Sequence, residues 1–136
     1  MKIYLAGRYS RRRELQQYGE QLEAAGHTIV SSWIDGHHET RPNVDATGSP
    51  AEQQAWALED CWDVLCCEAL ILFANEMGAA SRGGRFVEFG IALARSKRLM
   101  IVGRRENVFC HLPLVEQFDT FADCLAALSP AVMARA

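Results

Sequence analysis

The 136-residue sequence predicts a single α/β domain: a doubly wound, five-stranded parallel sheet of the flavodoxin-like or Rossmann-like kind, with helices on both faces. One observation behind this fold is that strand-like and helix-like segments alternate along the whole chain. Another is that residues 69–74 (ALILFA) and 98–103 (RLMIVG) are largely apolar runs, which are typical of strands buried on both faces. We expect the domain to span residues 1–129 and residues 130–136 to form a C-terminal tail.

The first part of the chain shows this alternation clearly. Residues 2–6 form a short β-prone run that stops at Gly7, and residues 11–25 then carry apolar side chains at helical spacing. Gly26 is a typical helix stop, so the second strand is expected at residues 27–33 (HTIVSSW). Together these segments predict a first β–α–β unit.

A long polar segment, residues 35–50, separates the second strand from the next helix. It contains two glycines and two prolines, and long loops in compact domains are usually functional or mobile. Ser49 is expected to cap a helix that begins at Pro50 and runs to about residue 67, because proline is favoured at the first helical position. The buried strand at residues 69–74 follows directly.

The second half of the chain continues the pattern. A glycine-bearing loop at residues 75–84 leads into a helix at residues 85–96 and then into the buried strand at residues 98–103. A weak fifth strand is expected at residues 115–118 and a last helix at residues 120–128. In a doubly wound sheet, a ligand binds outside the carboxyl ends of the strands, where the loops that follow the strands meet.

Composition and charge exclude several classes of function. Apolar residues make up 49% of the chain and charged residues 23%, which are ordinary values for a globular protein and argue against long disorder. The formal net charge is −3, from 14 basic and 17 acidic residues, so the chain lacks the basic excess of a protein that binds a nucleic acid polymer. No segment approaches the ~20 apolar residues of a membrane span. We therefore expect neither a nucleic acid polymer nor a membrane as partner.

The five cysteines indicate a reducing compartment. Their number is odd, Cys66 and Cys67 are adjacent, and no CxxC pair is present. This pattern is typical of reduced, buried cysteines and not of a disulfide framework. The apolar run at the N-terminus is too short for a signal peptide. We expect a cytoplasmic protein.

The first loop carries an unusual number of arginines. Its sequence, AGRYSRRREL, lacks the dinucleotide and P-loop fingerprints. Instead, Gly7 marks a turn, and Arg8 and Arg11 follow at a helix N-terminus, where backbone N–H groups favour anions. Each cation at such a place is unfavourable by ~0.3–1 kcal/mol, so the arginines require another reason. Two interpretations remain open: an anion-binding loop, or a solvated basic turn.

Two acidic residues lie in apolar surroundings and are candidates for chemistry. Asp60 shares a helical face with Trp56, and a carboxylate in an apolar stripe is costly to bury unless it is paired. The alternative is an aspartate at the edge of the stripe that reaches water. Glu88 follows Gly83 and Gly84 near a helix N-terminus, which favours the ionised carboxylate that a nucleophile or base needs. The alternative for Glu88 is an ordinary first-turn glutamate that complements the helix dipole.

Other polar and aromatic residues give weaker signals. His38 lies in a polar cluster with Asp35 and His37, but the cluster lacks a specific metal-ligand spacing, so no metal site is predicted and His38 is expected to be a loop contact. Trp33 could stack on an aromatic ligand, although packing in the core is the more frequent role. The GxSxG motif of a serine nucleophile is absent.

Three segments together resemble a known family. They are KIYLAGRYSRRREL at the N-terminus, Asp60 eight residues before Glu68 and the ALILF strand, and GGRFVEFGIAL. Over residues 1–110 the chain resembles the nucleoside 2-deoxyribosyltransferase superfamily, which includes the 2′-deoxynucleoside 5′-monophosphate N-hydrolases. The resemblance implies a flavodoxin-like fold, cleavage of an N-glycosidic bond in a nucleoside or nucleotide, and neither a metal nor an organic cofactor. It also implies a homodimer or higher even oligomer in which a neighbouring chain completes the site.

The resemblance also assigns roles to individual residues. Glu88 matches the nucleophile, Asp60 matches the aspartate that helps to handle the base or sugar, and Tyr4 matches the tyrosine that orients the nucleophile. In such chemistry an ionised carboxylate stabilises or traps an oxocarbenium-like state, and a carboxylic acid protonates the departing base. Asn107 is expected to be lent across a subunit interface. The expected substrate-binding residues are Gly7, Arg8, Tyr9, Arg11, Trp33, His38, Gly83, Gly84, Arg85 and Asn107.

Three functions remain open from the sequence. The first is an enzyme that passes the deoxyribosyl group to another base or to water, and the second is a catalytically silent nucleotide-sensing module with the same fold. The third, a flavodoxin-like FMN protein, is weakened because the first loop lacks a Ser/Thr-rich phosphate cradle. For the enzyme, the arginines predict a preference for the 5′-monophosphate over the free nucleoside, because guanidinium–phosphate pairing is strong and directional.

Overall fold

The sheet has five strands, all parallel, in the order β2-β1-β3-β4-β5. The computed structural model describes residues 1–37 and 48–129. Within them the strands are β1 (Lys2–Ala6), β2 (Thr28–Ile29), β3 (Ala69–Phe73), β4 (Arg98–Val102) and β5 (Val115–Phe118). The predicted doubly wound α/β fold is therefore confirmed, and the strand order reverses between β1 and β3.

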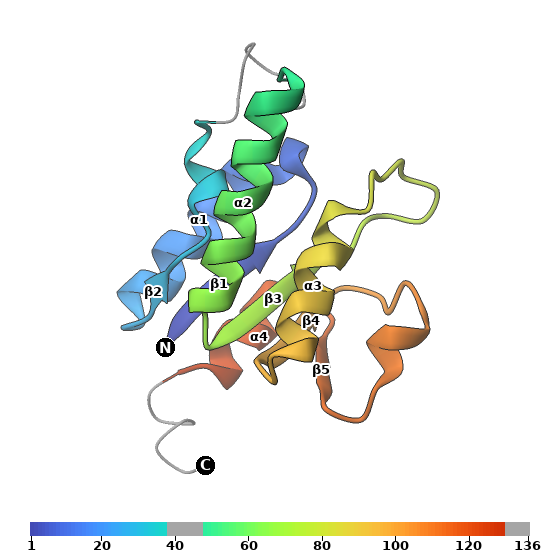
Figure 1. The fold of residues 1–136 in the computed structure, drawn as a ribbon. Coiled ribbons are helices and arrows are strands. Elements are labelled where there is room, and N and C mark those ends of the chain that lie inside the picture. Colours follow the sequence, from blue (N-terminus) through green and yellow to red (C-terminus); the bar gives the residue numbers. More distant parts are fainter. Residues whose placement is uncertain (38–47, 130–136) are drawn as a thin grey trace.

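Helices cover both faces of the sheet (Figure 1). Figure 1 shows α2 and α3 side by side in front of the sheet, while α1 and α4 lie behind it. The helices are α1 (Arg12–Ala24), α2 (Pro50–Cys66), α3 (Gly84–Ala94) and α4 (Phe121–Ala127). The described residues also contain three short 3-10 helices: η1 (Tyr9–Arg11), η2 (Ser32–Asp35) and η3 (Val108–His111).

The apolar runs of the sequence form the centre of the core. All five residues of β3 are buried, and so are the last four residues of β1. A strand that is covered by helices on both faces shows no alternation of polar and apolar side chains, because neither face meets water. The interpretation of residues 69–74 and 98–103 as strands buried on both faces agrees with this burial.

The start of α2 follows from local sequence alone. The Ser49 hydroxyl accepts a hydrogen bond from the Glu52 backbone N–H (3.2 Å), and the Glu52 side chain accepts one from the Ser49 backbone N–H (3.1 Å). This reciprocal capping box, with Pro50 as the first helical residue, fixes the helix start at the predicted position.

The second strand is much shorter than predicted. Only Thr28 and Ile29 pair with β1, and the expected strand at residues 27–33 is wrong beyond this point because η2 follows. From Ser31 onward, side-chain hydrogen bonds to the backbone of β1 replace the backbone hydrogen bonds of a paired strand. The Ser31 hydroxyl accepts from the Leu5 backbone N–H (3.1 Å), and Trp33 Nε1 donates to the Leu5 carbonyl (2.9 Å). As a result, Trp33 lies across the carboxyl end of β1.

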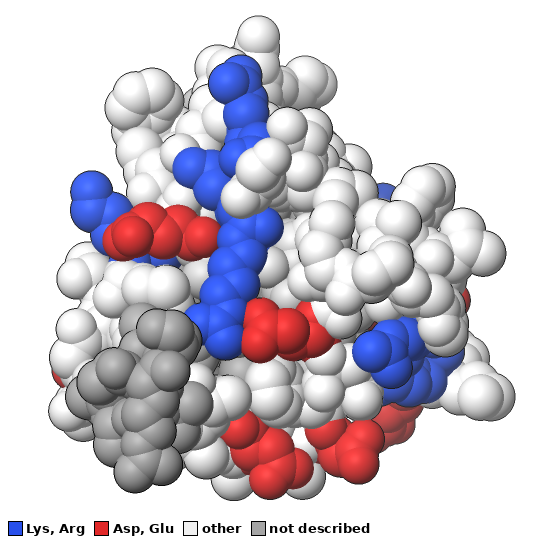
Figure 2. All heavy atoms as spheres, turned by 90° about the horizontal axis from the view of Figure 1, so that it is seen from below, with Lys and Arg blue, Asp and Glu red and all other residues white. Residues whose placement is uncertain are grey.

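Three further features of the described residues concern hydropathy, cysteines and surface charge. Among residues 1–37 and 48–129, no helix has both the length and the hydropathy needed to cross a membrane. The five cysteines are free. In the view from below, Figure 2 shows Lys and Arg side chains in a narrow file with Asp and Glu side chains beside it. On this face the two signs of charge are interspersed.

Candidate active site

A cleft of about 420 Å³ lies at the carboxyl edge of the sheet, beside the point where the strand order reverses. The loop after β1, η2, the middle of α2 and the segment that enters α3 all contribute to it. Its lining residues are Gly7, Arg8, Tyr9, Trp33, Asp60, Ala80, Ser81, Arg82, Gly83, Gly84, Arg85 and Glu88. Most of the predicted site residues, which are far apart in sequence, therefore meet in one cleft.

Glu88 lies in the second turn of α3, where its carboxyl group is surrounded by protein and opens on the cleft. Burial, together with the charge of the nearby Asp60, raises the pKa of Glu88 to about 8, while the hydrogen bond from Tyr4 acts to lower it. The expectation that the helix N-terminus keeps Glu88 ionised is therefore wrong. A desolvated carboxyl next to a second acid favours the neutral form, and this effect outweighs the dipole one turn away.

Asp60 faces the same cleft from the middle of α2. Burial, together with the charges of Glu59 and Asp63, raises the pKa of Asp60 to about 7, while the charge of His37 acts to lower it. Its Oδ1 atom is buried and has no hydrogen-bond partner among the described residues, although Asp60 as a whole is only half-buried. One of its two carboxyl oxygens is therefore withdrawn from water. Two interacting acids that both titrate near neutrality are the arrangement expected of an acid and a nucleophile in one site.

Tyr4 lies in β1, beneath the two acids, and is fully buried. Burial raises the pKa of the Tyr4 hydroxyl well above its usual range, and the charges of Glu88 and Asp60 raise it further. In the part of the chain that the structure describes, the hydroxyl has no partner with full hydrogen-bond geometry, but it lies close enough to Glu88 to lower the pKa of that carboxyl. Tyr4 thus stays protonated, and its O–H is available as a donor to Glu88.

An aromatic wall closes one side of the cleft. The rings of Tyr9 and Trp33 lie with their centroids 6.0 Å apart and are tilted by 37°. Trp33 is almost fully buried, and its hydrogen bond to Leu5 fixes the ring. The Arg12 guanidinium lies 6.0 Å from the centre of the Tyr9 ring. Tyr9 is partly exposed and offers an apolar ring face on which a planar ligand could stack, and the buried Trp33 supports it.

The predicted arginines fall into two groups. Arg8 and Arg82 line the cleft and make no ion pair with another residue in the described part of the chain. Arg11 does not line the cleft: its Nε and Nη2 atoms donate to Glu14 (2.9 Å each), and its Nη1 atom donates to the Ala74 carbonyl (2.9 Å). Arg11 therefore ties the first loop to the end of β3.

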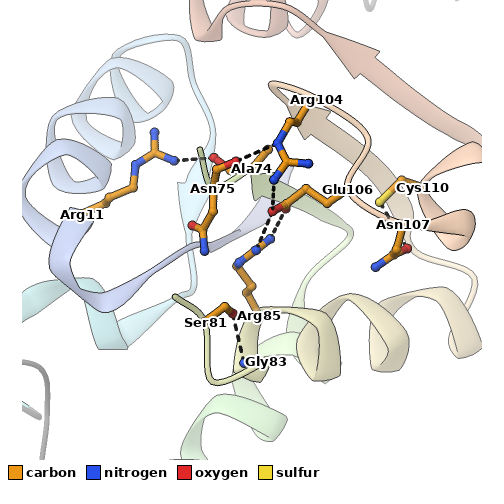
Figure 3. A network of polar contacts seen from close by, with 10 residues as sticks. All are labelled: Arg11, Ala74, Asn75, Ser81, Gly83, Arg85, Arg104, Glu106, Asn107 and Cys110. Atoms are coloured by element: carbon orange, nitrogen blue, oxygen red, sulfur yellow. Dashed lines mark hydrogen bonds and ion pairs between the residues drawn. The ribbon is translucent and has the colours of Figure 1, made fainter. Parts of the chain in front are cut away.

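Arg85 lines the cleft, but its guanidinium is already engaged. Both Nη atoms donate to the Glu106 carboxylate, and the guanidinium carbon lies 4.3 Å from the centre of the Phe86 ring. Figure 3 shows this pair together with Arg104, Asn75 and the Arg11–Ala74 contact. Sequence reasoning missed Glu106, Arg104 and Asn75, because each acts through a partner far away in sequence.

Two glycines have clear steric roles at the cleft. A Cβ atom on Gly7 would lie 2.9 Å from Leu15 Cδ2, so a side chain there would push against the core. Gly83 has a φ of 85°, a left-handed conformation that glycine adopts without strain, and it is the N-cap residue of α3. Gly84 is the first residue of that helix.

Two predicted residues lie elsewhere. Asn107 does not line the cleft of this chain; its Oδ1 atom accepts a hydrogen bond from the Phe109 backbone N–H (3.0 Å) at the start of η3. Val108 and Phe109 are exposed beside it. His38 lies outside the described residues, as does the tail at 130–136.

Carboxyl oxygens of Glu59, Asp60 and Asp63 lie within 4.8 Å of one another, a spacing that could hold a cation. However, the Ser32 backbone N–H donates to Asp63 (3.0 Å), and the single proton of its hydroxyl is shared between Glu59 (2.8 Å) and Asp63 (2.5 Å). His37 Nε2 lies 2.6 Å from Glu59. These hydrogen bonds account for two of the three acids, so we assign no metal to the cluster.

Comparison with family models and with curated proteins found no match. Solved structures do match. A 2-deoxyribosyltransferase from Bacillus psychrosaccharolyticus is 19% identical, with a TM-score of 0.72 over 95% of this chain and 96% of that chain. A Clostridium botulinum CMP N-glycosidase is 15% identical, with a TM-score of 0.56 over 94% of this chain and 98% of that chain. The resemblance seen in the sequence is thus confirmed at the level of the fold.

Proposed function

We propose that this protein cleaves the N-glycosidic bond of 2′-deoxynucleosides or their 5′-monophosphates, with Glu88 as nucleophile. The observation that carries the proposal is the pair of Glu88 and Asp60 in one cleft, with Tyr4 beneath them. The pair lies at the carboxyl edge of the sheet, where ligands of such folds bind. The names of the two similar structures, a deoxyribosyltransferase and an N-glycosidase, support the same chemistry.

The two acids have different roles, Glu88 as nucleophile and Asp60 as general acid, and they share one proton. Their pKa values of about 8 and about 7 mean that near neutral pH the pair holds roughly one proton. Because Glu88 has the higher pKa, the shared proton favours Glu88 in the free cleft. The productive form is the minor one, in which Glu88 is ionised and Asp60 is protonated. The Glu88 carboxylate bonds to C1′ as the C1′–N bond breaks, and Asp60 gives its proton to the departing base. The Tyr4 hydroxyl donates to Glu88 and orients it.

The second half of the reaction reverses these roles. Asp60, now ionised, accepts a proton from the incoming nucleophile, which is either water or the N–H of another base. The new bond forms at C1′, the Glu88 ester bond breaks, and Glu88 leaves as a carboxylate. The acceptor decides whether the protein is an N-hydrolase or a transferase.

The remaining lining residues fit the other parts of the substrate. The aromatic wall of Tyr9 and Trp33 would stack on the base, and the first loop with Gly7 would lie against the 5′ end of the sugar. Arg8 and Arg82 would bind a 5′-phosphate, because they line the cleft without an internal ion pair in the described chain.

The deciding experiment measures release of free base from a panel of deoxynucleosides and deoxynucleotides, with and without a second base as acceptor. Base release from wild type that is lost in Glu88→Ala would support the proposal, and a 2′-fluoro analogue should trap the glycosyl-enzyme. Tight binding with no release from any compound would instead indicate the nucleotide-sensing module. Exchange of bases identifies a transferase, and release without exchange identifies a hydrolase.

The 5′-phosphate is tested separately. Arg8→Ala and Arg82→Ala should each lower kcat/KM for the monophosphate by ~10-fold and leave kcat/KM for the free nucleoside within ~2-fold, since one ionic contact is lost. The monophosphate advantage should shrink at high salt, because salt screens exposed charges. Equal turnover of the monophosphate and the free nucleoside would instead favour the alternative interpretation, in which these arginines form a solvated basic turn without a ligand.

We also propose that two copies of the chain associate through α2 and α3. Leu58 and Trp62 on α2 are each 66% exposed, and Val87 on α3 is 62% exposed, so the paired helices present apolar side chains to solvent. Light scattering should report a dimer or a multiple of dimers. Trp62→Glu should lower the fraction of assembled protein. If wild type is a stable monomer at assay concentration, the proposed association is wrong, and Asn107 cannot complete the site of a neighbouring chain.

A further inference from the structure

A buried ion pair beside the cleft has no role in the reaction as described. Arg85 lies one turn before Glu88 on α3, and both residues line the cleft. The Arg85 side chain is 4% exposed and that of Glu106 is 8% exposed. The two Nη atoms of Arg85 donate to different oxygens of Glu106, with Nη2 to Oε1 at 2.8 Å. Such a bidentate pair fixes orientation as well as charge.

Further contacts hold this pair in place. Arg104 Nη2 lies 3.5 Å from Glu106 Oε1, and Arg104 Nε donates to the Asn75 carbonyl (3.1 Å). The loop after β4 is thereby tied both to the end of β3 and to the first turn of α3 (Figure 3). The guanidinium of Arg85 also stacks on Phe86. Its position is therefore defined from three sides.

The orientation of Arg85 matters because of what faces Glu88. Tyr4 from β1 and Asp60 from α2 act on the pKa of the Glu88 carboxyl. Arg85 lies one turn earlier on the same helix, but among the described residues its guanidinium does not act on that pKa. Burial and Asp60 raise the pKa of Glu88, and the lowering influence comes from Tyr4. A guanidinium within ~4–6 Å would instead favour the carboxylate and pair with it. A paired carboxylate is a weaker nucleophile and no longer shares a proton with Asp60.

We propose that Glu106 is a positioning residue for the cleft: by holding both Nη atoms of Arg85, it turns the guanidinium away from Glu88 and leaves that carboxyl without a cationic partner. Glu106 acts through Arg85 and does not touch the substrate. Its effect on turnover rests on the proposed function, whereas its effect on the ionisation of Glu88 does not.

The test compares two matched variants. Glu106→Gln removes the charge that holds Arg85. Glu116→Gln is the control, because it removes the charge that holds Arg98 in a second bidentate pair, between β4 and β5. In that pair Arg98 Nε donates to Glu116 Oε2 (2.7 Å) and Arg98 Nη2 donates to Glu116 Oε1 (2.9 Å). Carbon-13 NMR of labelled glutamate carboxyls follows Glu88, identified by the signal that Glu88→Gln loses. We expect its titration midpoint to fall by ~1 pH unit or more in Glu106→Gln and to stay unchanged in Glu116→Gln.

Kinetics provide an independent readout. Glu106→Gln should lower kcat by ~10-fold or more with KM within ~2-fold, and Glu106→Asp, which keeps the charge, should recover most of the loss. If Glu88 titrates in Glu106→Gln as in wild type, the positioning role is wrong. If Glu106→Gln instead tightens monophosphate binding with that midpoint unchanged, Arg85 is a phosphate ligand. If wild type releases no base, the proposed function fails while the NMR comparison still decides this inference.

A second variant covers the case in which Glu106→Gln does not fold. Arg85→Met together with Glu106→Gln removes both charges of the buried pair. Because Arg85 is already turned away from Glu88, the Glu88 midpoint should remain within ~0.3 pH units of wild type, far below the ~1–3 units that an opposite charge produces. A clear rise of the midpoint in this double variant would show that Arg85 already acts on Glu88, which contradicts the proposal.

Discussion

The amino and carboxyl edges of the sheet differ in whether their buried polar groups form hydrogen bonds. At the amino edge, His27 Nε2 donates to the Leu128 carbonyl (2.9 Å), which leaves Nδ1 to accept from the Met1 ammonium group (3.1 Å). The Lys2 backbone N–H donates to Glu68 (2.9 Å), and Arg98 pairs with Glu116. This edge joins the N-terminus, the first strands and the end of α4 through satisfied hydrogen bonds, as in an ordinary protein interior.

At the carboxyl edge, several buried polar atoms lack a hydrogen-bond partner within residues 1–37 and 48–129. They include the Tyr4 hydroxyl, Asp60 Oδ1, both amide atoms of Asn75 and Arg85 Nε. Each such group costs free energy when it is buried unpaired. A protein retains such costs mainly at functional sites, so the contrast indicates that this edge is organised for a ligand and the amino edge for stability.

The largest expected effect is the loss of the nucleophile. Glu88→Ala should lower the rate of base release by ~10³-fold or more, which corresponds to ~4 kcal/mol in the barrier, while substrate binding persists. Glu116→Gln, on β5 and paired with Arg98 at the start of β4, serves as the control and should turn over normally. A Glu88→Ala rate within ~10-fold of wild type would contradict the assignment of the nucleophile.

Asp60→Asn should have a milder effect. The amide can still hydrogen-bond the base but cannot give it a proton, so we expect a loss of ~10–100-fold, at the lower end of what general acids contribute. The wild-type rate should decline as pH rises past about 8, the higher pKa of the pair, because the two acids then hold no proton to give to the base. This decline should vanish in Asp60→Asn, and its persistence would assign the general acid to another group.

The cleft acids also predict how stability depends on pH. Burial raises the pKa of Glu88 to about 8 in the folded protein, above the value of an unfolded glutamate. The folded state therefore binds more protons, and this contribution to stability is fully present below about pH 4.5 and is lost as pH rises through about 8. Relative to Glu88→Gln, wild type should lose free energy of unfolding across this window in urea titrations. Parallel curves for the two proteins would disprove the raised pKa.

The smallest effect on activity is expected at the amino edge. His27→Phe leaves the Leu128 carbonyl and the Met1 ammonium group without their partner, so the free energy of unfolding should fall by ~1–3 kcal/mol. Base release by the folded variant should stay within ~2-fold of wild type, because His27 lies at the edge opposite the cleft. A large loss of turnover without a loss of stability would break the division between the two edges.

Local sequence was sufficient for most of the fold. The apolar run of β3, the reciprocal cap of Ser49 and Glu52, and the glycines before α3 each predict their element from interactions between near neighbours. Residues 27–33 are the exception, since β-prone side chains there form hydrogen bonds with Leu5 and the chain leaves the sheet after Ile29. A competing long-range contact of this kind has no local signal.

For the site, the sequence by itself determined which acids stand in apolar surroundings, namely Asp60 and Glu88, and that Arg8 belongs to the first loop. Only the tertiary structure decided what those groups do. Arg11 donates to the Ala74 carbonyl, 63 residues away, and Arg85 donates to the Glu106 carboxylate, 21 residues away. Neither guanidinium is therefore free to bind a substrate phosphate, although the sequence suggests that role. The ionisation of Glu88 is also decided by the tertiary structure. Burial and the charge of Asp60 on another helix raise the pKa of Glu88, and they outweigh the local helix dipole, which would lower it.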